Sequence, residues 1–187
     1  DEEAMFDALY MCNAVVNFAA ESHVGRAIVK SSRHLHTNIV GAATIAEVAT
    51  NYHMRMIQIS TDEVYGPVDS KEHPGLVEWD PILPSNPYAA SKAAQEAIAI
   101  AYWRTYKIPV IITNTINNFG EMQQSSKFPA IIQTKIEKGE IVTVHAESDG
   151  KPGSRSYVHS RNFADAILFL IKNKKPHLHE PLQADMP

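Results

Sequence analysis

The chain has almost no cysteine, no long apolar run and no excess of positive charge. Its single cysteine, Cys12, excludes an intrachain disulfide and favours a reducing compartment, so we expect a cytoplasmic protein in which Cys12 is a small buried apolar residue. No apolar segment reaches the roughly 18 residues of a membrane-spanning helix. A formal net charge of -4 argues against a nucleic-acid binder, since such proteins usually carry a basic surface. We therefore expect neither a nucleic acid nor a membrane as partner.

Two further patterns are missing. The nine histidines include no H-E-x-x-H motif, and one cysteine cannot form a cysteine pair, so we expect no metal. The chain begins Asp-Glu-Glu, without Met or a signal-peptide pattern, and we interpret it as a segment of a longer protein. Of the 187 residues, 44% are apolar and 20% charged, which predicts a folded domain with a real core.

Apolar periodicity predicts helices that alternate with strands. We expect strands at residues 14–20, 54–60, 109–116 and 140–145, and helices at residues 2–11, 33–52, 87–106, 128–138 and 160–173. Such alternation favours an α/β fold with a mainly parallel sheet. Ligands of these sheets bind beyond the carboxyl ends of the strands, which directs attention to residues 18–24, 60–66 and 116–120.

The first candidate pair is Tyr88 and Lys92, which share one face of a predicted helix because they are four residues apart. A lysine ammonium beside a phenol lowers the pKa of that phenol, and a phenolate can take a proton from a sugar hydroxyl. The alternative is a solvated Lys92 with Tyr88 as a rim aromatic.

The second candidate is the run Ser60-Thr61-Asp62-Glu63, which leaves a predicted buried strand. Two adjacent carboxylates repel one another, and different surroundings can make one an acid and the other a base. The alternative is a helix or turn cap made by Ser60, Thr61 and Asp62.

Three other segments have open interpretations. The run Asn114–Gly120 offers amides that recognise hydroxyl groups, or an Asx turn closed by glycine. The small residues Ala19 and Ala20 allow either a flat ligand or tight strand–helix packing. Arg155 is either a bidentate phosphate clamp or a surface arginine.

Taken together, the motifs resemble the extended short-chain dehydrogenase/reductase family. The motifs occur in the family's order between about residues 14 and 170: NFAAESHV, HTNIVG, ISTDEVYG, NPYAASKAAQE, ITNTINNFG, SKFP and RSYVHSRNFADAI. Within the family they are most similar to the dTDP-glucose 4,6-dehydratases, because sugar 4-epimerases usually have a Ser and other small residues in place of Thr-Asp-Glu.

The resemblance implies a fold and a domain plan. The fold would be Rossmann-like, with a doubly wound parallel sheet that is incomplete at its N-terminus and part of a small C-terminal substrate region. Residues 1–125 would form a partial NAD-binding domain with the catalytic residues, and residues 126–160 a substrate-binding region. A helix at 161–174 would return to the Rossmann-like domain, before a tail at 175–187.

The resemblance also implies a reaction, the conversion of dTDP-glucose to dTDP-4-keto-6-deoxyglucose. Tyr88 would be the base at the C4 hydroxyl, with its pKa lowered by Lys92, and Thr61 would bond the C4 oxygen. NAD would take the C4 hydride and later return it to C6. Glu63 would remove the C5 proton, and Asp62 would protonate the departing C6 hydroxyl.

The remaining implied roles concern binding and assembly. The resemblance implies that the cofactor would be bound by Ala19, Ala20, Thr37, Ser60, Tyr88, Lys92 and Asn118. It implies that the substrate would contact Ser22, His23, Thr61, Asn117, Lys127, Phe128 and Arg155. A homodimer would form through helices near 35–52 and 87–106.

The chain also departs from the family. None of its eight glycines forms the Gly-x-x-Gly-x-x-Gly loop that holds the NAD pyrophosphate, so we expect this segment alone to bind NAD weakly and to be inactive. Gly25 stands where the dehydratases typically have Asp, and the segment 143–145 that often touches the nucleotide differs. Two alternatives stay open: a related epimerase, decarboxylase or dehydratase of UDP- or CDP-sugars, and a non-catalytic dinucleotide-sensing or assembly module.

Overall fold

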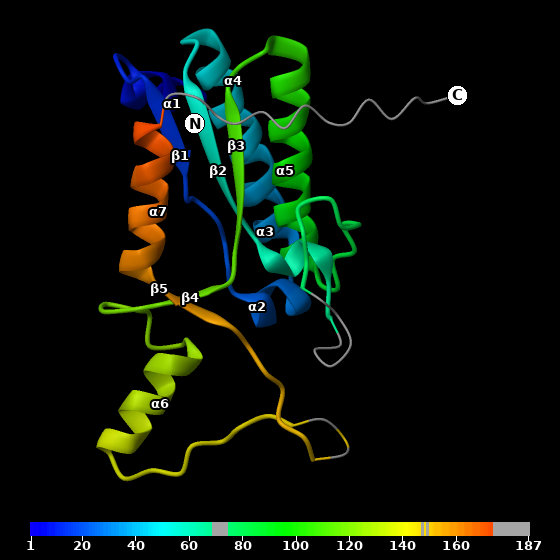
Figure 1. The fold of residues 1–187 in the computed structure, drawn as a ribbon, viewed down its shortest axis with the longest axis vertical. Coiled ribbons are helices and arrows are strands. Elements are labelled where there is room, and N and C mark those ends of the chain that lie inside the picture. Colours follow the sequence, from blue (N-terminus) through cyan, green and yellow to red (C-terminus); the bar gives the residue numbers. More distant parts are fainter. Residues whose placement is uncertain (69–74, 147, 149, 174–187) are drawn as a thin grey trace. The chain divides into compact units, whose positions relative to one another are not determined.

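The computed structural model describes residues 1–68, 75–146, 148 and 150–173, and it divides into two compact units (Figure 1). The first unit runs from Asp1 to Thr115 and includes Asn173, and the second runs from Ile116 to Lys172. The predicted tail at 175–187 lies outside the described residues. The other predicted domain limits stay predictions.

The first unit is a three-stranded parallel sheet with helices packed on it. Its elements are α1 (Glu2–Leu9), β1 (Ala14–Asn17), α2 (Val24–Val29), α3 (Ser32–Leu35), the π-helix η1 (His36–Val40), α4 (Gly41–Asn51), β2 (Arg55–Thr61), the 3₁₀ helix η2 (Asp62–Tyr65), α5 (Pro87–Tyr106) and β3 (Val110–Thr115). The strand order is β1-β2-β3, and both pairs are parallel. The predicted α/β, Rossmann-like parallel sheet is therefore confirmed.

Helices α4 and α5 pack against each other and against this sheet (Figure 1). Helix α5 follows the prediction at both ends because its signals are local. Asn86 caps its N-terminus, Pro87 takes the first helical position, and Lys107 ends it in the left-handed conformation, with φ 61°.

The core lies between α4 and the sheet. Small residues of α4 are completely buried there, which lets the helix approach the sheet closely. The buried cluster comprises Val15, Ile45, Ala46, Val48, Ala49, Met54, Met56 and Ile108, with Met5, Phe6 and Leu9 of α1 packed against it.

The second unit contains β4 (Asn117–Phe119), α6 (Phe128–Glu137), β5 (Tyr157–His159) and α7 (Ser160–Lys172). Strands β4 and β5 form a parallel pair, with Asn117 opposite Tyr157. The predicted strand at 140–145 is wrong: no described strand pairs with it, and the side chains of Ile141 and Val144 are exposed. Alternation of apolar and polar residues does not by itself place a neighbouring strand beside residues 140–145 to accept and donate their backbone hydrogen bonds.

Several other local predictions differ from the structure. The predicted helix at 33–52 is divided into α3, η1 and α4, and the short elements α2, η2, β4 and β5 were not predicted. Cys12 is exposed rather than buried. Within the part of the chain that the structure describes, no helix is long and apolar enough to cross a membrane, and no group of three His, Cys, Asp or Glu residues could hold a metal ion.

The core makes a prediction about stability. Met56→Ala should lower the free energy of unfolding by about 2–5 kcal/mol, because it leaves a cavity at a completely buried site. Urea unfolding followed by circular dichroism measures this change. The matched control is Met11→Ala, whose side chain is 83% exposed and whose loss should have little effect. Equal effects of the two substitutions would contradict the assigned core.

Candidate active site

The acidic run Thr61-Asp62-Glu63 begins at the last residue of the buried strand β2. Thr61 is the last residue of β2, and Asp62 and Glu63 begin η2. The Thr61 hydroxyl accepts a hydrogen bond from the Glu63 backbone N–H at 3.3 Å and donates to Asp62 Oδ1 at 3.2 Å. Thr61 thus caps η2, as the structural alternative proposed, and the cap holds both carboxylates at the carboxyl end of the sheet.

Helix α5 brings Tyr88 to this run. The Tyr88 hydroxyl is hydrogen-bonded to Thr61, and the charges of Glu63 and Asp62 act on it. Burial, followed by the charge of Glu63, raises the pKa of Tyr88 to about 12, although the Thr61 bond opposes this. The expected lowering by Lys92 is therefore not the net effect in this structure, because the loss of water and the two carboxylates dominate.

Lys92 lies one turn further along α5 and is 4% exposed. Its ammonium donates to the carbonyl oxygen of Ile59 at 2.6 Å and to Gln95 Oε1. Burial lowers the Lys92 pKa to about 8, although the Glu96 carboxylate favours the charged form. The alternative of a solvated Lys92 is wrong.

Glu96 is a buried acid that the sequence analysis did not select. Burial raises its pKa, and the hydrogen bond from Asn114 together with the Lys92 charge opposes the rise. Asn114 on β3 donates to Glu96 Oε1 at 2.7 Å. The Asn114 amide and the Lys92 ammonium thus favour the charged form of this buried carboxyl.

A buried amide network extends from the same face of α5. Gln95 Oε1 accepts from Gln58 Nε2 at 3.1 Å, and Gln58 Oε1 accepts from Asn17 Nδ2 at 2.9 Å. Gln95 Nε2 donates to the Asn38 carbonyl oxygen at 2.8 Å, and Asn38 Nδ2 donates to Ser91 Oγ at 2.8 Å. These residues link β1, β2, η1 and α5.

The sequence contained a signal for this network. Gln58 stands in the middle of the apolar strand MRMIQIS, where an uncharged polar residue needs a buried partner. Gln95 is three residues after Lys92 and therefore lies on its side of the helix.

The segment after β1 is held by two asparagines. Asn17 Oδ1 accepts from the Ala19 N–H at 3.0 Å. Asn38 Oδ1 accepts from the Glu21 N–H at 2.8 Å, and its Nδ2 donates to the Glu21 carbonyl at 3.1 Å. These bonds fix the backbone on both sides of the half-buried Ala20. The predicted cofactor contact Thr37 is exposed on η1, whereas its neighbour Asn38 is completely buried.

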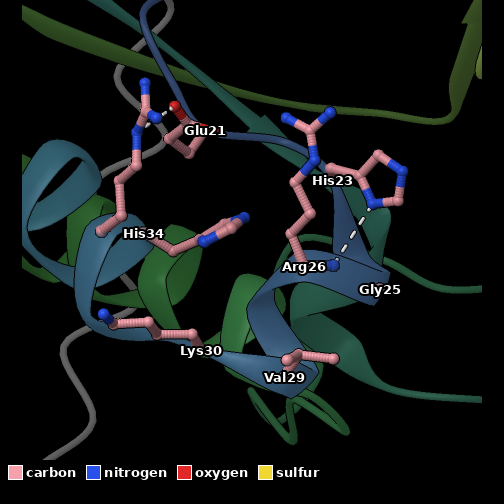
Figure 2. Close-up of a pocket in the computed structure, with 8 residues that line it drawn as sticks. Glu21, His23, Gly25, Arg26, Val29, Lys30 and His34 are labelled. Carbon is pink, nitrogen blue, oxygen red and sulfur yellow. Dashed lines mark hydrogen bonds and ion pairs between the residues drawn. The ribbon is translucent and has the colours of Figure 1, made fainter.

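Ser22 and His23 continue this segment into α2. His23 caps α2, since its Nδ1 accepts from the Arg26 N–H at 3.3 Å. Figure 2 shows His23 at a pocket of about 430 Å³, lined by Glu21, His23, Gly25, Arg26, Val29, Lys30, Arg33 and His34. Arg33 forms an ion pair with Glu21 at 2.7 Å. The cap occupies Nδ1 of His23, and the predicted sugar contact of this residue stays a prediction.

The remaining predicted site residues belong to the second unit. Asn117 Nδ2 donates to the Ser156 carbonyl at 3.4 Å, which brings β4 beside the exposed Arg155. Asn118 Nδ2 donates to the Ile116 carbonyl at 3.2 Å. Lys127 and Phe128 stand at the start of α6. Their expected roles in binding substrate or cofactor stay predictions.

Comparisons with known proteins add to this geometry. The model of the NAD dependent epimerase/dehydratase family matches residues 1–180. The dTDP-glucose 4,6-dehydratase of Haemophilus influenzae is 40% identical over 148 residues, which are 74% of this chain and 44% of that protein. The enzyme of the same name from Streptomyces niveus is 33% identical over 175 residues, which are 91% of this chain and 49% of that protein.

Solved structures give the same fold. The dTDP-glucose 4,6-dehydratase of Streptomyces venezuelae, solved with NAD bound, superposes with a TM-score of 0.84 and 34% identity, over 91% of this chain and 52% of that chain. A UDP-glucuronic acid 4-epimerase of Bacillus cereus, 18% identical, also gives 0.84, over 94% of this chain and 55% of that chain, and shows the fold alone. The chain spans about half the length of the relatives it matches.

The lowered pKa of Lys92 predicts a pH dependence of stability. Between about pH 8, where folded Lys92 titrates, and pH 10, the unfolded chain binds more protons at this residue than the folded chain. The free energy of unfolding should therefore rise with pH, by about 2 kcal/mol over this window relative to Lys92→Met. Above pH 10 the raised pKa of Tyr88 acts in the opposite direction.

Urea unfolding of both proteins at several pH values measures this difference. Parallel pH curves for the natural and Lys92→Met proteins would contradict the assigned burial of the ammonium.

Proposed function

The chain belongs to the NAD dependent epimerase/dehydratase family, and from this premise we propose that the full-length protein is a nucleotide-sugar 4,6-dehydratase. Its substrate would be dTDP-glucose and its product dTDP-4-keto-6-deoxyglucose. The relatives of that name, at 33–40% identity, support the proposal. The observation that carries it is the arrangement of Thr61, Asp62 and Glu63 beside Tyr88.

The chemistry needs an acid and a base on neighbouring carbons of the sugar, and adjacent carboxylates suit this. In the proposed reaction Tyr88 removes the proton of the C4 hydroxyl. The Thr61 hydroxyl, which donates to Asp62 in this structure, would turn to donate to the C4 oxygen. Loss of the C4 hydride, which bound NAD would accept, leaves a ketone that acidifies the C5 proton, and Glu63 removes that proton. Asp62 protonates the C6 hydroxyl as it leaves as water. A simple epimerase needs no such acid, so the two carboxylates favour the dehydratase.

The donors at this site suit the nicotinamide-ribose end of NAD. Lys92 offers three N–H donors, of which two have acceptors among the described residues. The hydroxyls of Thr61 and Tyr88 are hydrogen-bonded to each other. When bound, NAD would accept a hydride from C4, return one to C6 and bring a positive charge that favours the Tyr88 phenolate. The chain has no glycine-rich loop for the pyrophosphate, so this segment alone should bind NAD weakly.

Tyr88 is held as a phenol by its surroundings in this structure. The Lys92 ammonium donates to Ile59 and Gln95. The positive charge of bound NAD would therefore assist the proposed base role of Tyr88.

Assembly and location belong to the same proposal. We expect a homodimer through the helices at 35–52 and 87–106, which expose the apolar side chains of Leu35, Val40 and Ile100. A cytoplasmic location rests on the single cysteine.

Glu63→Gln provides a test of the proposed reaction. With NAD and dTDP-glucose, the full-length protein should form a 4-keto-6-deoxy product, measured by its absorbance in alkali. The variant should form it at least about 100-fold more slowly, because an amide cannot accept the C5 proton. Glu3→Gln, which changes an exposed carboxylate of α1, is the matched control. Unchanged dehydration in Glu63→Gln would contradict the assigned base.

Arg155→Ala tests the proposed contact with the substrate diphosphate. The KM for the nucleotide sugar should rise about tenfold with little change in kcat, because a lost phosphate contact weakens binding throughout the reaction. The control is Arg104→Ala, at an exposed arginine of α5. A lower kcat with an unaltered KM would exclude the phosphate role.

A further inference from the structure

Asn86 joins the candidate base to the helix that carries the candidate tyrosine. We propose that Asn86 is a positioning residue: its side-chain amide fixes the Glu63 carboxylate relative to the first turn of α5, and thereby relative to Tyr88. This inference rests on the proposed function for its catalytic meaning, whereas the hydrogen bonds themselves do not depend on that function.

The two ends of the Asn86 amide have different partners. Its Oδ1 accepts a hydrogen bond from the Ala89 backbone N–H at 2.9 Å, which caps α5. Its Nδ2 donates to Glu63 Oε2 at 3.1 Å. Because Asn86 precedes Tyr88 by two residues, a single side chain links the acidic run to the start of the catalytic helix.

Only one orientation of this amide satisfies both partners. A flipped amide would direct its NH₂ group toward the Ala89 N–H and its oxygen toward the Glu63 carboxylate, and both contacts would be repulsive. The cap therefore determines the direction of the donor, and the donor determines where the carboxylate lies. A half-buried position strengthens this coupling, because water competes less for the carboxylate.

The residue type has a specific consequence here. Ser, Thr, Asp and Asn all cap helices well, but among these Asn combines a cap acceptor with a separate N–H donor. Asp at position 86 would keep the cap and add a further negative charge beside Glu63. Ser would keep the cap but is too short to present a separate donor. Both substitutions keep the helix cap and remove the donor to Glu63, so they test the positioning of Glu63 without loss of the cap.

The experiment compares Asn86→Asp, Asn86→Ser and Asn86→Ala in the full-length protein. Asp and Ser should leave the melting temperature nearly unchanged, whereas Ala should lower it by a few degrees because the cap is lost. Asp and Ser should nevertheless lower kcat for dehydration by about 10- to 100-fold. The acid limb of the pH–kcat profile should move to higher pH by roughly one unit, since the charged form of the base loses a donated hydrogen bond.

The matched control is Asn13→Asp, which adds the same charge at an exposed residue that precedes β1 and should leave kcat and the pH profile unchanged. If Asn86→Asp and Asn86→Ser have the same kcat and pH profile as the unsubstituted protein, the inference is overturned and Asn86 acts only as a helix cap. Loss of kcat in Asn13→Asp as well would also overturn it, because the effect would then come from added charge at any position.

A second readout does not require turnover. The carboxyl carbon of Glu63 is followed by ¹³C NMR as a function of pH, and its signal is assigned by its absence in Glu63→Gln. The titration midpoint should move to higher pH in Asn86→Ser. If the natural protein forms no 4-keto-6-deoxy product but the midpoint moves, the proposed function fails and the coupling stands. If the product forms and the midpoint does not move, the proposed function stands and the inferred coupling between Asn86 and Glu63 is wrong.

Discussion

The buried ammonium of Lys92 is the constraint on which the rest of this site depends. An ammonium removed from water is costly unless acceptors replace the water, and here the Ile59 carbonyl and the Gln95 amide do so. Because Gln95 is itself buried, its amide needs partners, which Gln58 and Asn38 supply. One buried charge thus requires a network that ties α5 to the sheet and to η1.

The network also sets the electrostatics of the candidate active site. It turns the Lys92 ammonium toward Ile59 and Gln95, so burial and the neighbouring carboxylates determine the pKa of Tyr88. The same network, through Asn38, holds the backbone that follows β1. A rigid first turn of α5, capped by Asn86, then fixes the distance between phenol and carboxylates. The chemistry of the site is therefore a property of the whole strand–helix unit.

Local signals predicted much of the fold. The bounds of α5 follow from Asn86, Pro87 and an alanine-rich run, and the strands β2 and β3 follow from β-branched and apolar runs. The prediction of strands failed where a strand forms only if a neighbouring strand is present. The segment at 140–145 alternates like a strand but has no described strand beside it, while the three-residue strands β4 and β5 exist because they pair with each other.

The sequence by itself determined which residues could do chemistry and which elements carry them. The spacing of Tyr88 and Lys92 places them on one helical face, and the position of Thr61 places the acidic run at a strand end. The tertiary structure alone decided what these groups contact. The acceptors in the network lie up to 57 residues from their donors along the chain, and periodicity reports only neighbours. Burial by distant elements therefore decides the direction of the Lys92 ammonium and the pKa of Tyr88.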